Sequence, residues 1–415
     1  MIGVLALGFN LRGAITSLPP VFPELQDRLG LSAAEVSVLA ATPVICFAVF
    51  SGFAALLSRR LGEERVLLIA VLALTAGLLL RGAAPGALLF PGTVLAAAAI
   101  AIMNVLLSSL IKRRWPERAG LLIGVYITAL SVGAITGSVV SVPLWNGTGG
   151  SVALTLSWLA GPAALAALLW LPQARYATRP GSALAALAAL PGEPADAPAA
   201  PGVPAAGGGS ASGRASAASP AARVAVHRHA LAWHVTLFMG LQSLLYYAAL
   251  SWLPTILRDR GASAGTAGDL LALMGVGNLA VSLLVPVVAQ RMRGQHALVV
   301  PTVVAMAAGL AGVVYLPLGS AVVWVLILGA GQNAALSLAI FFTMARAPHA
   351  AAAASLSSLA QAVGYLLASA GPLEVGLLHS ATGSWNVPVA VLFVLNAVLL
   401  GAGLLAARDR VLPAA

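Results

Sequence analysis

Long apolar segments separated by short polar ones run through most of this chain. Each apolar segment approaches the roughly 20 residues that an α-helix needs to cross a bilayer. The pattern predicts twelve membrane spans near residues 2–22, 34–57, 66–84, 87–111, 119–142, 152–172, 231–257, 266–290, 296–317, 320–345, 351–378 and 386–407. We therefore expect an all-α polytopic membrane protein.

One segment in the middle of the chain cannot form a packed core. Residues 178–224 consist largely of Ala, Pro, Gly and Ser, with consecutive glycines at 207–209. This composition is typical of a flexible linker, because it offers too little apolar surface to offset the loss of chain entropy on folding. We expect an N-terminal six-helix half over 1–173, a cytosolic linker over 174–229 and a C-terminal six-helix half over 230–415.

The two halves share a weak sequence repeat at an offset of 231 residues. At this offset Arg60 matches Arg291, and a short motif recurs as Pro23, Gly30 and Ser32 in the first half and as Pro254, Gly261 and Ser263 in the second. Ser32 and Glu35 also have the spacing of a helix capping box. Two six-span repeats joined by a linker predict the major facilitator fold, in which the halves rock about a midplane site.

Composition excludes several classes of protein. Only 8% of the residues are charged and 60% are hydrophobic, unlike a soluble domain. The net charge is +10, but the basic residues lie between apolar segments, so we expect no nucleic-acid binding. The single cysteine, Cys46, excludes a disulfide framework or a cysteine metal site. The chain has no hydrolase, metalloprotease or phosphate-loop motif, and we expect neither an enzyme nor a cofactor.

The basic residues are divided unequally between the two sides of the predicted membrane. Seventeen of the 22 Lys and Arg residues lie on the side of the linker and the C-terminus. The other side has Arg28, Arg81, Arg258 and Arg260, and Arg12 alone lies within a span. Because positive residues favour the cytosolic side, we expect both termini in the cytosol. The expected location is a bacterial-type inner membrane, with a monomer as the functional unit.

Arg12 is the least expected residue in the apolar pattern. An arginine near the bilayer centre costs about 3 kcal/mol on insertion scales, so it should face the protein interior or a wet cavity. Other polar residues in the spans share helix faces at spacings of three or four residues. The candidate substrate-binding residues are Arg12, Thr16, Asn104, Tyr126, Gln242, Tyr246, Tyr247, Asn333, Gln361 and Tyr365.

These candidates together indicate a particular kind of ligand. The repeat offset places Arg12 opposite Ser243, beside Gln242, at equivalent depths in the two halves. A guanidinium makes paired hydrogen bonds to planar acceptor groups, amides add donors, and tyrosine rings stack. The set suits a small planar solute with acceptor atoms or a negative charge. No span has a central Asp or Glu, which argues against proton symport through a membrane carboxylate.

Each candidate also has a structural interpretation. Arg12 could be a pin bonded to carbonyl groups of a neighbouring helix, and Gln242 and Gln361 could join helices to one another. The tyrosines could be packing residues. Trp252 and Trp385 lie near span ends and are expected to be anchors at the membrane interface. Glu374 and His379 are expected at an exposed helix end, and not in proton coupling.

Several longer strings of residues point to one family. The first is Asn10-Leu11-Arg12 with Ala14-Ile15-Thr16-Ser17 and Pro20. The second is Gly240-Leu241-Gln242-Ser243 with Tyr246 or Tyr247 and Trp252-Leu253-Pro254. The third is Gln361-Ala362-Val363-Gly364-Tyr365 with Gly371-Pro372, Gly376 and Thr382-Gly383-Ser384-Trp385. With Asn104-Val105-Leu106-Leu107 and Lys112-Arg113, the chain resembles the cyanate and nitroimidazole transporter family of the major facilitator superfamily.

This resemblance implies transport of small solutes that are often anionic or nitro-bearing. It also implies a substrate role for Arg12, Gln242 and Tyr365, which lie on the matched strings. The chain departs from the family where Gly13 and Ser108 replace frequent prolines, which predicts straighter helices at both points. In the loop of residues 57–65, the aspartate usual in the superfamily is replaced by Arg59. Either Glu63 or Glu64 takes over its contact, or the charges of this loop only set the membrane topology.

The sequence thus predicts an alternating-access secondary transporter of a small anionic or acceptor-rich solute, with Arg12 as the substrate anchor. A multidrug efflux carrier is an alternative, but it should have a membrane carboxylate for proton exchange. A nitrate–nitrite exchanger should have a second arginine in the other half. A non-transporting sensor with this fold is the alternative from another class, and it should have a sizeable soluble output domain. The expected partners are the small-molecule or anion substrate and the lipid bilayer.

Overall fold

The computed structural model describes residues 2–115, 119–176, 226–276 and 278–413. Helices account for nearly all of this part of the chain, and no strand occurs in it. Most of the expected linker, from 177 to 225, lies outside the described residues.

The helices divide into two groups along the chain. The N-terminal group comprises α1 (Ile2–Thr16), η1 (Pro19–Val21), α2 (Phe22–Leu29), α3 (Ala33–Leu61), α4 (Glu63–Ala83), α5 (Pro85–Arg114), α6 (Ala119–Gly147), α7 (Val152–Ser157) and α8 (Ala160–Tyr176). The C-terminal group comprises η3 (Val226–Arg228), α10 (Ala230–Asp259), α11 (Ala264–Val276), α12 (Asn278–Gln290), α13 (His296–Tyr315), η4 (Leu318–Ser320), α14 (Ala321–Ala345), α15 (Ala350–Thr382) and α16 (Asn386–Ala406).

Ten segments in the described residues are long and apolar enough to cross a bilayer. Two of the twelve predicted spans fall outside that set. They are the eighth, covered by α11 and α12 on either side of residue 277, which lies outside the described residues, and the eleventh, covered by α15. Large apolar side chains such as Leu79, Leu168 and Val394 are more than half exposed on the outside of the bundle. Such a surface is suited to lipid contact.

Two predicted spans are broken in the structure. The first, expected over 2–22, bends after Thr16 through η1 and continues as α2, because Pro19, Pro20 and Pro23 lack the N–H groups that a continuous helix requires. The sixth is divided into α7 and α8 by a turn at Trp158 and Leu159. By contrast, α1 and α5 run without a break through Gly13 and Ser108, and the straighter course expected there stays a prediction.

The predicted repeat corresponds to matching turns in the two halves. Gly30 ends α2 with φ of 65°, and Gly261 follows α10 with φ of 97°, both in the left-handed region that favours glycine. The capping box at Ser32 is confirmed: its hydroxyl accepts from the Glu35 amide, and the Glu35 carboxylate accepts from the Ser32 amide at 2.8 Å. Ser263 likewise accepts from the Thr266 amide at the start of α11.

Glycines bring α1 against α6. A Cβ atom on Gly13 would lie 2.9 Å from the Gly133 carbonyl oxygen, and one on Gly137 would lie 2.5 Å from the Gly13 carbonyl oxygen. The spacing of Gly133 and Gly137 is that of a small-residue helix contact in membranes. This contact fixes the position of the α1 turn that carries Arg12.

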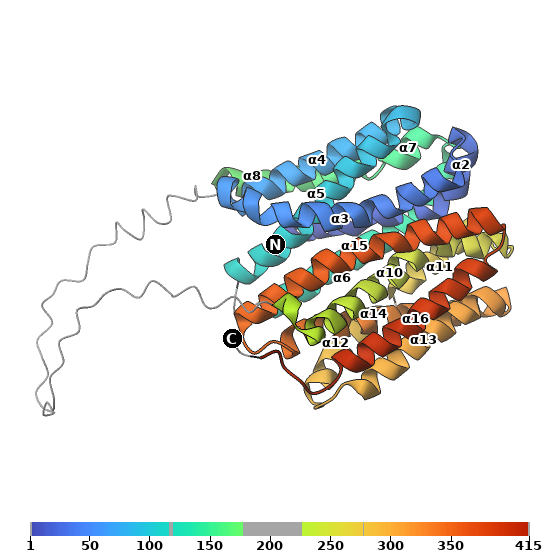
Figure 1. The fold of residues 1–415 in the computed structure, drawn as a ribbon. Helices are drawn as coiled ribbons and strands as arrows, with labels where there is room; N and C mark the ends of the chain where they lie inside the picture. The colour runs from blue at the N-terminus through green and yellow to red at the C-terminus, as the bar shows by residue number, and fades with distance from the viewer. Residues whose placement is uncertain (1, 116–118, 177–225, 277, 414–415) are drawn as a thin grey trace, which may run out of the picture.

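The halves are joined at one end of the bundle and separated at the other. Both chain termini lie at one end, which we call the terminal end, and we call the opposite end the distal end (Figure 1). The halves contact each other through α3 with α15 and through α6 with α11, which are equivalent pairs in the repeat. The hydrophobic core of the C-terminal half also includes Leu18, Phe22 and Val36 from the distal part of the N-terminal half. The distal end is therefore closed by apolar packing.

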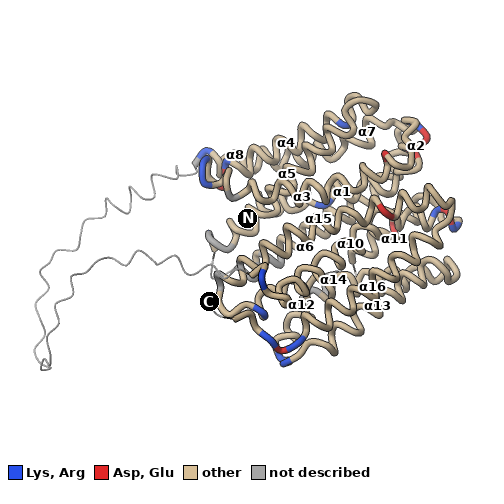
Figure 2. The backbone as a smooth tube through the Cα atoms, viewed as in Figure 1, with Lys and Arg blue, Asp and Glu red and all other residues tan. Residues whose placement is uncertain are grey.

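Charged residues gather at the two ends of the bundle. Figure 2 shows Lys and Arg concentrated at the terminal end, with acidic residues few in the bundle as a whole. This distribution agrees with the charge asymmetry in the sequence. That the terminal end faces the cytosol stays a prediction.

Arg81 corrects the expectation that Arg12 is the only basic residue within the spans. Its side chain lies in α4 and is only 1% exposed. The guanidinium donates to the Leu156 carbonyl at 2.8 Å and to the Ala14 carbonyl at 3.4 Å. Arg81 is close to the span end, so the sequence suggested an exposed position, but α7 and α1 supply backbone acceptors that allow it to be buried. Arg81 thus has the structural pin role that was an alternative for Arg12.

Candidate functional site

A cavity of about 1020 Å³ lies between the two halves. It extends to Ala347 and His349, which connect α14 to α15 at the terminal end. Its described lining comes from α1, α3, α5 and α6 of one half and from α10, α14 and α15 of the other. The two halves thus form one chamber that opens toward the terminal end.

Arg12 supplies the only permanent charge among the described residues that line this chamber. Its guanidinium donates to the Tyr246 hydroxyl at 3.0 Å and lies 5.5 Å from the centre of the Tyr246 ring. This contact joins α1 to α10 across the chamber. A cation–π contact contributes about 0.5 to 2 kcal/mol, whereas removing a charged group from water costs several kcal/mol. A negatively charged ligand would therefore stabilise the Arg12 guanidinium more than the Tyr246 phenol does alone.

Aromatic rings form one side of the chamber next to Arg12. Tyr246 and Tyr247 meet edge to face with ring centres 5.2 Å apart. Phe47 of α3 makes similar contacts with Tyr247 at 6.4 Å and with Tyr365 of α15 at 5.9 Å. Edge-to-face contacts hold the rings in defined orientations. The rings offer flat surfaces and hydroxyl groups to a planar solute.

Asn104 and Tyr126 form a second polar group in the chamber. The Tyr126 hydroxyl donates to the Asn104 side-chain oxygen at 3.1 Å, which joins α6 to α5. Thr16 also lines the chamber, but its hydroxyl bonds to the Arg12 carbonyl at 3.2 Å and to the Ala134 carbonyl at 2.8 Å. Its hydroxyl therefore holds α1 against α6. Gln361 lines the chamber and donates to Ser357 at 2.9 Å.

Two candidates do not line the chamber. Gln242 is 2% exposed, and its amide donates to the Ser243 hydroxyl at 2.7 Å and to the Met239 carbonyl at 3.2 Å. The Asn333 amide donates to the Gly329 carbonyl at 3.2 Å in its own helix. The buried Gln242 amide thus finds its hydrogen-bond partners within its own helix. Neither residue is in the chamber lining in this conformation, and a role for either in binding the solute stays a prediction.

Several lining residues were not among the predicted candidates. Phe47 was missed because an aromatic residue in an apolar span gives no sign of its neighbours. His349 is exposed at the mouth of the chamber, where its Nδ1 accepts from the Ala352 amide and caps α15. The lining contributed by α14 is mainly apolar and includes Leu336, Ile340 and Met344. The chamber therefore combines polar and aromatic groups with apolar surface.

The distal end contains an ion pair between the halves. Arg258 of α10 lies 2.7 and 2.8 Å from the two carboxylate oxygens of Glu24 in α2. Trp252 is 5% exposed, donates to the Pro372 carbonyl at 2.8 Å and lies 6.3 Å from the Phe22 ring. The expectation that Trp252 anchors the protein in the membrane interface is wrong, because its ring is buried where the halves meet.

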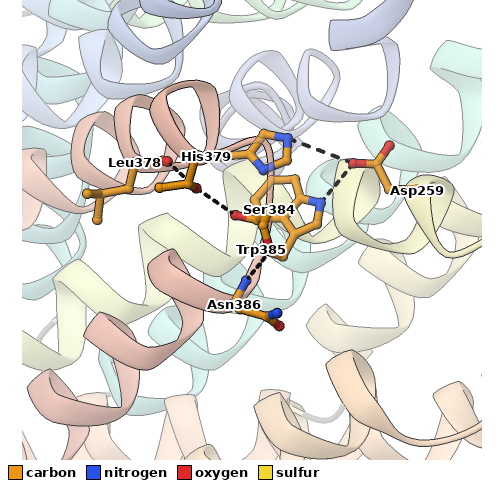
Figure 3. A network of polar contacts seen from close by, with 7 residues as sticks. Asp259, Leu378, His379, Ser384, Trp385 and Asn386 are labelled. Atoms are coloured by element: carbon orange, nitrogen blue, oxygen red, sulfur yellow. Dashed lines mark hydrogen bonds and ion pairs between the residues drawn. The ribbon is translucent and has the colours of Figure 1, made fainter.

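Trp385 belongs to a separate polar cluster at the ends of α10, α15 and α16. Figure 3 shows the rings of Trp385 and His379 against each other, both directed at Asp259. The indole Nε1 donates to the Asp259 carboxylate at 2.8 Å. The His379 ring stacks on the indole at 3.8 Å between centres. Trp385 thus contacts protein groups rather than acting only as an interface anchor.

Glu64 is the acidic partner at the terminal end of the N-terminal half. Its carboxylate lies 3.6 Å from the Arg114 guanidinium of α5, and Glu63 accepts from Ser109 at 3.4 Å. Arg59, which replaces the aspartate usual in this loop, is exposed. The two glutamates therefore contact α5, while a gating role for them stays a prediction.

Removing the distal ion pair should make the distal end easier to open. We expect Glu24→Gln to lower the stability of the closed distal end by about 1 to 3 kcal/mol, because a partly buried charge-assisted contact is lost and Arg258 is left unpaired. Distances between spin labels on α2 and α10 would measure the larger open population. The matched control is Glu35→Gln, which removes a carboxylate on the same end but within one half. Equal distance distributions for both variants would contradict the expectation.

Comparison with known proteins identifies the fold and the family. Residues 4–372 match the model of the Major Facilitator Superfamily. The chain is 34% identical to the 2-nitroimidazole transporter of Escherichia coli K12 over 98% of this chain and 95% of that protein. It is 27% identical to the cyanate transport protein CynX of the same organism over 91% and 89% of the two chains.

The solved structures agree with this result at the level of the fold. A bacterial homologue of the human lysosomal transporter Spinster, in an inward-facing and unoccupied conformation, superposes with a TM-score of 0.72 at 16% identity. The match covers 99% of this chain and 97% of that one. The chain therefore belongs to the major facilitator superfamily, and its relatives group it with the cyanate and nitroimidazole transporters.

Proposed function

We propose that this secondary transporter carries a small anionic or acceptor-rich solute, with Arg12 as the substrate anchor. The observation that carries the proposal is the position of Arg12 in the chamber. It is the one permanent charge among the described lining residues, and its described hydrogen bond leads to a phenol and not to a carboxylate. Because no negative group in the described lining balances the positive charge of Arg12, the chamber favours a ligand that carries a negative charge.

The surrounding groups support a planar solute. Tyr246, Tyr247 and Tyr365 are next to the guanidinium, and Asn104 with Tyr126 adds hydrogen-bonding groups. The names of the two relatives refer to 2-nitroimidazole and cyanate. Both compounds present acceptor atoms that a guanidinium can bind. In this proposal the halves alternate about the chamber, each chain works as a monomer, and the terminal end faces the cytosol of a bacterial inner membrane.

A thermal-shift screen of the purified protein tests the proposal. Small anions and nitro-aromatics, including cyanate and 2-nitroimidazole, would be compared with neutral apolar drugs. We expect stabilisation by members of the first set in wild-type protein, and none of it in Arg12→Ala. Equal stabilisation of both proteins would overturn the proposed anchor.

Two other functions make different predictions in the same screen. A multidrug efflux carrier would be stabilised mainly by neutral apolar compounds, which the wall of Leu336, Ile340 and Met344 could accommodate. The described lining has no carboxylate for proton exchange, which favours the anion carrier. A non-transporting sensor would bind the solute tightly but show no flux in proteoliposomes.

A further inference from the structure

The charge balance of the chamber limits how the empty protein can move. Arg12 is the only permanent charge in the described lining, and the chamber is open toward the terminal end in this structure. Water can therefore hydrate the guanidinium in this conformation. Tyr246, Tyr247 and Tyr365 are neutral neighbours, so none of them cancels its charge.

The change to the opposite conformation has to pass through a state that is closed at both ends. Closing the terminal end while the distal end is still closed removes most of this water. A guanidinium that loses its hydration without gaining an anion is strongly disfavoured, and a phenol and ring faces compensate for only part of the loss. With a bound anion, the same closure buries a neutral pair that keeps its hydrogen bonds.

We infer that the protein is an obligate anion exchanger: it changes conformation readily when an anion occupies Arg12 and only slowly when the chamber is empty. One anion then leaves on one side only when another is carried back. This inference rests on the proposed function, because it requires that Arg12 binds the solute. The inference adds that transport occurs by exchange, a point that the identity of the solute does not determine. In this mechanism the bare charge of Arg12 prevents leakage through the empty carrier.

The structure offers a reporter of distal opening that needs no substrate. Ser37 of α3 is fully buried, and Gly376 of α15 lies directly against its hydroxyl, so the two halves cover it. Ser37 is not in the lining of the chamber. A cysteine at this position can react with a polar maleimide only after the distal end opens. Cys46 is the single native cysteine, and Cys46→Ser gives a background without others.

The test measures the maleimide reaction rate of Ser37→Cys/Cys46→Ser protein in nanodiscs, in HEPES–Tris buffer without added solute. Rates are normalised to the rate of the same protein unfolded in detergent. We expect the addition of Arg12→Gln to increase the rate about tenfold or more, which corresponds to about 1.4 kcal/mol. Arg12→Lys is the matched control, because it keeps the charge and should stay within about twofold of the parent.

A rate for Arg12→Gln within about twofold of the parent would overturn the exchange inference, because charge would then not limit opening of the empty protein. A rate that rises equally in both variants would also overturn it, since loss of the guanidinium shape would then be the cause. Neither result depends on a ligand. The proposed function fails separately, through the thermal-shift screen, if wild-type protein and Arg12→Ala respond alike to the anions.

Discussion

Arg12→Ala is expected to abolish solute transport and to weaken solute binding about 100-fold or more. Two charge-assisted hydrogen bonds from a guanidinium to an anion contribute about 1.5 to 3 kcal/mol each, and every 1.4 kcal/mol changes affinity tenfold. Alanine removes both bonds and the positive charge of the chamber. Uptake of labelled solute into proteoliposomes and equilibrium binding would measure the two effects.

The Tyr246→Phe variant distinguishes the contribution of Arg12 to solute binding from that of the Tyr246 hydroxyl. The hydroxyl is the described hydrogen-bond acceptor for Arg12, whereas the ring stays in place in the phenylalanine variant. We expect a loss of affinity of about tenfold or less, because one neutral contact of about 1 kcal/mol is removed. A loss as large as that of Arg12→Ala would indicate that the phenol itself binds the solute and that Arg12 only positions it.

Unliganded stability provides a second control for Arg12→Ala. Because the arginine has no acidic partner in the described lining, its removal should leave the melting temperature of the empty protein unchanged or slightly higher. Arg81→Ala should instead lower it, because the carbonyls of Leu156 and Ala14 lose a buried donor. A large loss of stability in Arg12→Ala would mean that the arginine is a structural pin.

Most of the helices could be predicted from the sequence, because a segment that crosses a bilayer has to be apolar along its whole length. The sequence also indicated Arg12 and the tyrosines, since polar groups are rare in spans and usually face inward. It could not predict which acceptor each side chain selects. Gln242 is one turn before Tyr246 and shares its helix face, yet its amide turns to Ser243 and the backbone of its own helix.

Contacts between the two halves could not be predicted from a single sequence. Glu24 and Arg258 are separated by 234 residues, and nothing in the pattern of either span connects them. Trp252 resembled an interface anchor because its depth was the only available guide. The identity of its neighbours Phe22 and Pro372 depends on how two whole six-helix units pack together. Arg81 was misplaced for the same reason, since its acceptors come from other helices.

A single glycine in α6, Gly133, allows the close approach to α1 that positions Arg12 in the chamber. Gly133 lies so close to the α1 backbone that a Cβ atom would overlap the Phe9 carbonyl oxygen. Backbone atoms cannot move aside as a flexible side chain can. The two helices would have to separate, and α1 also carries Arg12 into the chamber. Thr16, whose hydroxyl reaches the Ala134 carbonyl, would lose that bond as well.

Gly133→Ala is therefore expected to lower the free energy of unfolding by about 1 to 3 kcal/mol, the usual effect of overpacking. This loss should exceed the gain of up to about 1 kcal/mol that alanine brings to a helix interior. Gly133→Leu should prevent folding. Gly161→Ala in α8 is the matched control, because a Cβ there meets nothing within 4 Å, and it should be neutral or stabilising. Thermal unfolding followed by tryptophan fluorescence would compare them, and equal melting temperatures would contradict the close approach of α1 and α6.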